Sequence, residues 1–420
     1  MLKLKRLKVH KCRSVQPGTE LVFNGRLNIV LGKNGAGKTT LLKLVAAVVG
    51  SSFADEFQDD DIHVEYEYEL HGVQVRCEFR HDDARVDDPV QATPMRLPIF
   101  QVTFYSARGD AVSARIRGND LTITSGATEF PLKINPNVLN VPSLDLVGFI
   151  GSYLSHIPGI PEDLRPFATL DTKLPHRLDE GLDWLRLTLQ DLAINFFSEI
   201  DDDARWCLAN MRHSGVSAEF RGAFAEYRHR FAELPELLAA HSDALPFLRR
   251  ACEQIGLRDA SWTLSFLEHD RRRVEVKRYG RSQVYVTTHG GTRFPLEKLS
   301  FGQLRLFGFF LHSAMHPHVI VADELTNGLH HEMVDCCIAT IGERQAFLAT
   351  QNPLLLDHIG FDDAAEVQRT FVLCDLQGDP DGERAMRWRN MSADEAHEFF
   401  ADYRVGVQHV NDILRKRGLW

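Results

Sequence analysis

Cysteine is scarce in this chain, and its placement argues against a disulfide framework. The 420 residues contain seven cysteines, with no CxxC pair and no regular spacing. Disulfide frameworks use even sets of cysteines and form in oxidising compartments. We therefore expect reduced thiols and a cytoplasmic protein.

Long apolar runs are also missing. The most apolar segment, Leu139 to Ile160, is broken by Pro142, Asp145 and Pro158, whereas a membrane helix needs roughly 18 uncharged residues. The opening sequence, MLKLKRLKVHKC, alternates basic and apolar positions and lacks the apolar core of a signal peptide. These patterns predict an amino-terminal strand and neither a membrane segment nor a membrane partner.

The chain also lacks an excess of positive charge. Its formal net charge is -10, so the whole molecule repels phosphate backbones, and binding of nucleic acid requires a local basic patch. The candidate patch surrounds the turn at Tyr279 and Gly280 and consists of Arg271, Arg272, Arg273, Lys277, Arg278 and Arg281. A solvated edge hairpin is the simpler interpretation, so nucleic-acid binding is possible but not required.

Hydrophobic residues make up 44% of the chain and charged residues 25%, which is typical of a folded protein. The pattern predicts an α/β fold, in which a mixed parallel core sheet and an antiparallel sheet form one body that a helical insertion interrupts. We divide the chain into an amino-terminal half, an insertion, a carboxy-terminal half and a helical tail, at residues 1–138, 139–262, 263–380 and 381–420.

Hydrophobic periodicity supports this division. Alternation from Ile62 to Phe130 predicts a meandering antiparallel sheet, and Ser392 with Glu395 predicts a capping box that opens the tail helix. The insertion is predicted from two sets of apolar residues at helical spacing, for which core packing is the simplest role. These sets are Leu182, Leu185, Leu189 and Leu192, and Phe220, Phe224, Tyr227, Phe231 and Leu234.

A glycine-rich loop carries the strongest chemical signal. The sequence GKNGAGKTT follows an apolar strand and opens a helix, and it satisfies the pattern G-x-x-x-x-G-K-[ST]. In such a loop the backbone N–H groups hold phosphates, Lys38 meets the β- and γ-phosphates, and Thr39 ligates Mg²⁺. We therefore predict binding of ATP and Mg²⁺ by Gly32, Lys33, Asn34, Gly35, Ala36, Gly37, Lys38, Thr39 and Thr40.

Two carboxylates follow a second apolar strand, Val319 to Ala322. Asp323 can hold Mg²⁺, and Glu324 can orient the water that attacks the γ-phosphate. An ordinary strand end or helix cap is the alternative for an isolated Asp-Glu pair. Together with the glycine-rich loop, the pair predicts an ATPase with Glu324 and Lys38 as catalytic residues.

The sequence Leu299-Ser300-Phe301-Gly302-Gln303 opens a helix shortly before the acidic strand. It resembles the LSGGQ signature of ABC-type ATPases, with Phe301 in place of the first glycine. The resemblance implies that Ser300, Gly302 and Gln303 complete a partner subunit's nucleotide site in a head-to-tail dimer. A serine that merely caps its own helix is the local alternative.

Two departures from the ABC pattern limit which branch of the ABC-type ATPases the chain resembles. Gln351 stands where the switch segment of that family usually has a histidine, and the segment Asn327–His331 lacks the expected aspartate. Glutamine can hydrogen-bond a phosphate or the attacking water but cannot accept a proton, which predicts slow or partner-dependent turnover. The chain is most similar to the SMC, RecF and OLD branch, and a transporter subunit is disfavoured.

In length, the chain resembles the SMC-like ATPases without long arms. This group includes ATPase subunits of antiphage systems such as Septu and PARIS. The residues after Leu376 are too few and too helical for the nuclease domain of OLD proteins. The resemblance therefore implies a self-associating ATPase that controls a separate nuclease or toxin in bacterial antiphage defence. The alternative is a RecF-like DNA-binding ATPase of repair.

Overall fold

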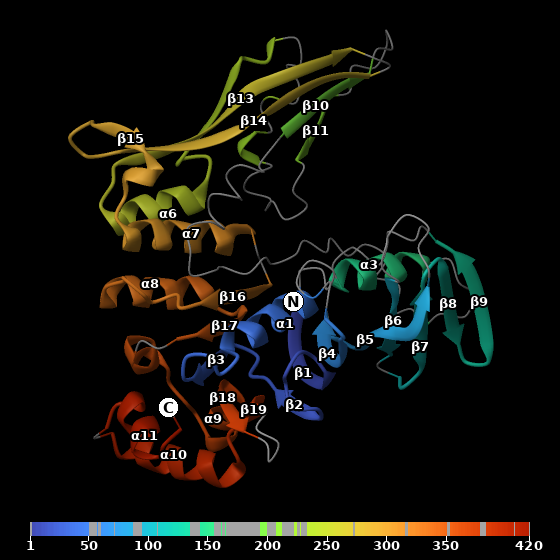
Figure 1. Ribbon diagram of the computed structural model, residues 1–420. Coiled ribbons are helices and arrows are strands. Elements are labelled where there is room, and N and C mark those ends of the chain that lie inside the picture. Colours follow the sequence, from blue (N-terminus) through green and yellow to red (C-terminus); the bar gives the residue numbers. More distant parts are fainter. Residues whose placement is uncertain are drawn as a thin grey trace. The chain divides into compact units, whose positions relative to one another are not determined.

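The computed structural model (Figure 1) describes residues 2–49, 57, 60–70, 72–86, 95–106, 108–134, 143–154, 161, 164, 194–199, 207–211, 222–224, 227, 233–271, 274–315, 318–350, 353–378, 384–406 and 408–419. Within these residues the fold is mixed α/β, with a mainly parallel sheet and two antiparallel sheets, which confirms the predicted fold class. The chain divides into two compact units. The first contains Met1–Arg177, His318–Asp323 and Glu343–Trp420, and the second contains Leu178–Pro317 and Glu324–Gly342.

The mainly parallel sheet lies in the first unit and has the strand order β16-β17-β3-β18-β19. Its parallel strands β3, β16 and β17 are apolar and largely buried, as expected for strands covered on both faces. The parallel strand β18 is buried in its first half only, and β19 joins the edge in the antiparallel direction. The bounds are β3 Leu27–Gly32, β16 Val319–Asp323, β17 Gln345–Ala349, β18 Phe371–Gly378 and β19 Arg384–Asn390. The central strand β3 therefore leads directly into the glycine-rich loop and then into α1, Lys38–Val49.

The first unit also holds an antiparallel sheet with the order β2-β1-β4-β5-β6-β7-β8-β9. The alternation in the sequence is realised, because side chains of β4 are buried at every second position. The bounds are β1 Leu2–Lys11, β2 Thr19–Val22, β4 His63–Leu70, β5 Val73–Val86, β6 Met95–Tyr105, β7 Ala111–Arg117, β8 Asp120–Ser125 and β9 Thr128–Lys133. One continuous buried core joins this sheet, α1 and the parallel sheet.

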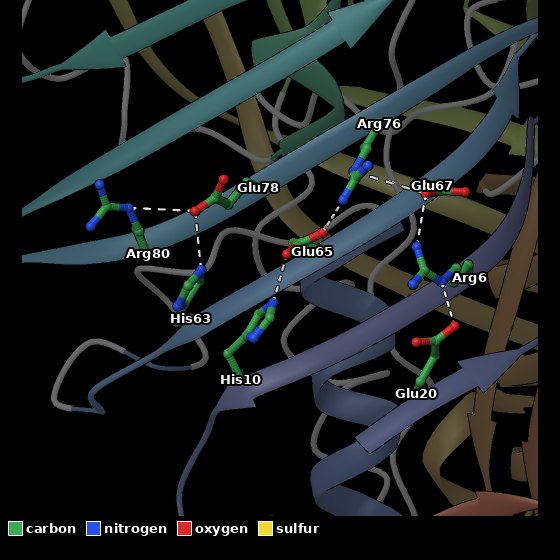
Figure 2. Close-up of polar contacts among 9 residues, drawn as sticks. All are labelled: Arg6, His10, Glu20, His63, Glu65, Glu67, Arg76, Glu78 and Arg80. Carbon is green, nitrogen blue, oxygen red and sulfur yellow. Dashed lines mark hydrogen bonds and ion pairs between the residues drawn. The ribbon is translucent and has the colours of Figure 1, made fainter. Parts of the chain in front are cut away.

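Paired charges cover part of one face of this sheet, on β1, β2, β4 and β5 (Figure 2). Arg6 donates to Glu20 at 2.7 Å and to Glu67 at 3.0 Å, and Arg76 pairs with Glu65. These cross-strand ion pairs favour the observed strand register.

Two histidines on the same face extend the set of cross-strand pairs. The rings of His10 and His63 stack with their centroids 4.4 Å apart. His10 lies 2.7 Å from Glu65, and His63 lies 3.0 Å from Glu78. These contacts also favour the observed register.

The second unit contains an antiparallel sheet with the order β11-β10-β14-β13-β12. A short strand, β15 at Arg293–Pro295, pairs with β14. Helix α6, Pro246–Ile255, packs on β13 and on α7, Phe301–Met315, which in turn packs on α8, His331–Ile341. The strand bounds are β10 Ile194–Glu199, β11 Cys207–Met211, β12 Leu237–His241, β13 Asp259–Arg271 and β14 Val274–Thr287.

The prediction of a helical segment through residues 139–262 is wrong in part. Helices α3, Ser143–Leu154, and α6 lie there, but so do strands β10, β11 and β12. Short apolar runs such as those of β10 and β12 do not distinguish helix from strand by periodicity, and pairing with the long strands β13 and β14 decides the outcome. The leucine set at 182–192 lies outside the described residues, as do Phe220 and Phe231, and the four-part division stays a prediction.

The carboxy-terminal tail is helical from Ala393 on, but the prediction of a helical tail over residues 381–420 is wrong in part, because Arg384–Asn390 form strand β19 by pairing with β18. Helix α10, Ala393–Val405, begins with the expected capping box of Ser392 and Glu395, and α11 spans Val410–Lys416. Among the helices of the described residues, none is long and apolar enough to cross a membrane.

Candidate nucleotide site

The glycine-rich loop needs its glycines because neighbouring strands approach it closely. A Cβ on Gly32 would lie 2.2 Å from the carbonyl oxygen of Cys374, and one on Gly37 would lie 2.3 Å from Met386 Sδ. Gly37 also has φ +89°, which disfavours any other residue. The loop is thereby fitted against β18 and β19, with the first turn of α1 directly after it.

Two adjacent residues of the loop make very different contacts. Lys38 is 7% exposed, and its ammonium donates to the carbonyls of Gly32 at 2.8 Å and Lys33 at 3.2 Å. Thr39 Oγ1 donates to Asp323 Oδ2 at 2.7 Å, across 284 positions of sequence. The structure therefore brings together the hydroxyl and the carboxylate that the sequence predicts as Mg²⁺ ligands. This donor set fits the ion, because Mg²⁺ prefers oxygen ligands from a few protein groups.

Asp323 is the last residue of β16 and Glu324 follows it, and both are almost fully buried, at 4% and 2% exposure. Glu324 has φ +51°, in the left-handed region that costs a residue with a Cβ roughly 1–2 kcal/mol. Its carbonyl accepts from the Asn327 N–H at 3.1 Å, which closes the turn after the strand. Such strain is typical of functional sites, so the backbone supports a special role for Glu324.

The signature segment lies in the second unit at the start of α7. Ser300 Oγ lies 3.0 Å from Gln303 Oε1 and 3.4 Å from the Gln303 backbone N, and Gln303 Oε1 also accepts from the Ser300 N–H at 3.0 Å. This reciprocal arrangement is a capping box. Ser300 therefore caps its own helix, as the alternative interpretation of the sequence expects. A contact between Ser300 and a partner's phosphate would come in addition to this capping role.

Gly302 is packed against the turn after Glu324. A Cβ on Gly302 would lie 2.3 Å from the Gly328 carbonyl oxygen. Phe301 is 49% exposed, and the Arg305 guanidinium lies 5.3 Å from its ring centre. Arg305 also donates to the Asn327 carbonyl at 3.4 Å. The glycine is thus required by local packing, whereas the phenylalanine that replaces the family's glycine projects outward.

Gln351, the predicted substitute for the switch histidine, lies outside the described residues. Its role stays a prediction.

Sequence reasoning missed the residues that support the loop from β18 and β19. Burial raises the pKa of the Cys374 thiol to about 12, although the nearby Lys38 charge opposes the rise, so the thiol stays neutral beside the loop. Met386 and Trp388 are buried on one face of β19. No motif marks these residues, because strand pairing alone brings them to the loop.

Comparison with known protein families supports a nucleotide-binding ATPase. Residues 6–132 match a family described as "AAA domain", and residues 172–357 match one described as "AAA domain, putative AbiEii toxin, Type IV TA system". The first match contains the glycine-rich loop, and the second contains Ser300, Asp323 and Glu324. No curated protein matches the chain. The matches and the Thr39–Asp323 contact agree on the class of P-loop nucleotide-binding ATPases.

Three solved structures illustrate the similarity in fold. The SMC head domain from Thermotoga maritima is 12% identical, with 93% of this chain and 99% of that chain covered and a TM-score of 0.36. The protein cbiO1 from Clostridium perfringens, part of an ABC transporter complex, is 12% identical, with 96% of this chain and 93% of that chain covered and a TM-score of 0.31. The recombination mediator protein RecF of the RecFOR pathway is 12% identical, with 93% of this chain and 98% of that chain covered and a TM-score of 0.32.

Proposed function

We propose that the chain binds Mg-ATP in the loop from Gly32 to Thr40 and hydrolyses it. The observation that carries this proposal is the 2.7 Å hydrogen bond between Thr39 Oγ1 and Asp323 Oδ2. It joins the glycine-rich loop to the acidic strand and presents a hydroxyl and a carboxylate oxygen together, as Mg²⁺ coordination in P-loop ATPases requires. Bound Mg-ATP supplies the phosphoanhydride that is cleaved and a cation that neutralises its phosphate oxygens.

The chain's own residues have separate roles in this proposal. Backbone N–H groups of the loop bind phosphate oxygens, and Lys38 turns its ammonium from the Gly32 and Lys33 carbonyls toward them. Glu324 orients the attacking water and accepts its proton. Gln351 hydrogen-bonds the water or a phosphate oxygen, and because an amide does not accept a proton, we expect slow turnover.

We further propose that two copies of the chain associate head to tail around the nucleotide. In such a dimer Ser300, Gly302 and Gln303 contact the phosphate held by the partner copy. The support is local: this segment opens a helix of 15 residues, and the positive end of a helix dipole favours an anion.

The proposed purpose is control of a separate effector, a nuclease or a toxin, in cytoplasmic antiphage defence. The family matched by residues 172–357 carries a description that names a toxin and a toxin–antitoxin system, which supports this choice. The predicted low turnover also suits a device in which the ATP-bound state holds an effector and hydrolysis releases it.

The alternative, a RecF-like DNA-binding ATPase, depends on the basic hairpin of β13 and β14. Among the described side chains of that hairpin, Arg278 pairs with Glu268 at 2.5 Å, so one candidate charge is already neutralised. Arg272 and Arg273 lie outside the described residues. The remaining described charges, Lys277 and Arg281, give only weak support for a phosphate-binding face.

The test measures ATP turnover and oligomeric mass for the native chain and for Glu324→Gln, each with and without duplex DNA. We expect Glu324→Gln to bind ATP, to lose turnover by about 100-fold or more, and to accumulate as an ATP-dependent dimer. The matched control is Glu332→Gln, an exposed residue in the first turn of α8, which should retain native turnover.

Each outcome decides between the proposals. A trapped dimer without an effect of DNA supports the effector-controlling ATPase. Strong stimulation by DNA with a steep salt dependence favours the repair ATPase instead. A native chain that does not bind ATP at all rules out both.

A further inference from the structure

Trp388 presents a buried donor beside the glycine-rich loop. The side chain is 2% exposed, and its Nε1 lies 3.0 Å from the position that a Cβ on Gly37 would take. This indole N–H is buried and has no hydrogen-bond partner among the described residues. Buried polar groups are nearly always paired, so an unpaired one beside a ligand-binding loop calls for a functional explanation.

Strand pairing places Trp388 under the loop. In β19 it pairs with Cys374 of β18, which pairs in turn with Gly32 at the end of β3. Met386, two positions earlier on the same buried face, lies against Gly37 as well. The main chain of Met386 is held in place, since its N–H donates to the Ser14 carbonyl at 2.8 Å and its carbonyl accepts from the Gln16 N–H at 2.9 Å. Trp388 therefore sits on a fixed support.

The indole N–H can only donate, so it requires an acceptor. In the structure, the carbonyls of Gly32 and Lys33 accept from Lys38. When Lys38 turns toward phosphates, as the proposed function requires, both carbonyls lose their bond from Lys38, and the Lys33 carbonyl keeps its bond from the Ala36 N–H at 3.2 Å. Each carbonyl oxygen of the loop has two lone pairs and can accept a further bond, and the Trp388 N–H is a donor that needs an acceptor.

We propose that Trp388 is a positioning residue for the phosphate-binding loop: its indole N–H donates to a main-chain carbonyl of the Lys33–Gly37 segment in the nucleotide-bound form. The bond fixes the loop in its phosphate-binding shape and offsets the contacts that Lys38 gives up. This inference rests on the proposed nucleotide binding. Packing of the ring alone would need no N–H.

The test follows the indole N–H directly, by ¹⁵N–¹H NMR of the full chain titrated with MgADP. The Trp388 resonance is assigned by its absence in Trp388→Phe or, if that variant does not fold, in Trp388→Tyr. We expect it to move downfield on saturation, as a newly hydrogen-bonded proton does. The matched control is the indole of Trp262 in the second unit, which already donates to Ser282 and should not move.

Affinity gives an independent measurement. Trp388→Phe should weaken MgADP binding by about 3- to 10-fold, the effect expected for one lost hydrogen bond between neutral groups, while Trp262→Phe should bind as the native chain does. Saturable MgADP binding that leaves the Trp388 N–H unmoved would overturn the positioning role and leave the proposed function intact. A native chain that does not bind MgADP would overturn the proposed function itself.

Discussion

Lys38 and Thr39 are neighbours in sequence, but they contact different parts of the fold. Lys38 holds the carbonyls of its own loop, whereas Thr39 reaches the end of β16 through a single hydroxyl. The contribution of Thr39 can therefore be removed without touching the loop. In the proposed mechanism that hydroxyl coordinates Mg²⁺ and does not contact the phosphates.

Thr39→Val removes the hydroxyl and keeps the shape of the side chain. We expect affinity for MgATP to fall by about tenfold or more, since hydrogen bonds and ligands to charged groups contribute roughly 1.5–3 kcal/mol. Affinity for ATP in EDTA should not change, because the phosphate contacts remain. Calorimetric titration with and without Mg²⁺ measures both values, and an equal loss in the two conditions would contradict a metal-binding role.

At the scale of elements, the pairing of strands brings charged side chains together and changes their pKa values. On the antiparallel sheet of the first unit, burial acts to raise the pKa of Glu65, but hydrogen bonds from Arg76 and His10 outweigh it and lower the pKa from 4.5 to about 2. A carboxyl with a lowered pKa stabilises the fold above its unfolded pKa, and this contribution is lost as the pH falls through the folded pKa. Glu65 should therefore stabilise the sheet fully above pH 4.5 and progressively less toward pH 2.

Glu65→Gln tests that expectation. We predict a loss of roughly 1 kcal/mol in the free energy of unfolding at pH 7, as for a partly exposed ionic network, and a smaller difference from the native chain below pH 4.5. Urea unfolding across this pH range measures it. The control is Glu69→Gln, on the same strand as Glu65. It removes only an exposed ion pair with Lys5 of β1 and should have almost no effect on the free energy of unfolding. A difference that grows on acidification would refute the assignment.

Gly302 tests the packing of the second unit. Its Cβ position is 2.3 Å from the Gly328 carbonyl, which is backbone and cannot move aside cheaply. Gly302→Ala should therefore lower the free energy of unfolding by about 1–3 kcal/mol, as overpacking does. At Gly290 the nearest atom is 3.8 Å away, so Gly290→Ala should be tolerated. Equal melting temperatures for the two variants would show that the turn after Glu324 adapts freely.

At the scale of the whole molecule, burial controls the chemistry of the thiols. The six cysteines whose side chains the structure describes are free, as the sequence predicts, and five of them are buried. Burial raises the pKa of all six, to about 12 for Cys12, Cys252 and Cys374. Because the thiolate is the reactive form, these thiols should react slowly at neutral pH.

A thiol titration of the native chain should accordingly show slow reaction at these six cysteines, with the partly buried Cys336 the fastest of them. In guanidinium chloride all seven cysteines should react, because the sequence contains seven and we expect none in a disulfide. Rapid reaction of the buried Cys374 in the native chain would indicate that β18 separates readily from the loop.

Much of the nucleotide site was predictable because its signals are local. The loop from Gly32 to Thr39 and the Asp323–Glu324 pair have fixed spacing and apolar strands before them, and the structure joins Thr39 to Asp323. Strands β10 and β12 were missed because their short apolar runs take their conformation from distant partners. Met386 and Trp388 were missed for the same reason, since only the pairing of β19 with β18 brings them to the loop.

The ladder of paired charges in Figure 2 has a kinetic consequence. Three arginines stand among four glutamates, each within reach of an opposite charge, so their fields largely cancel beyond about 10 Å at ordinary ionic strength. A partner that approaches this part of the sheet is therefore neither drawn in nor turned by these particular charges. These paired charges therefore add little to the rate of association, and steering of a charged partner depends on the other charges of the protein.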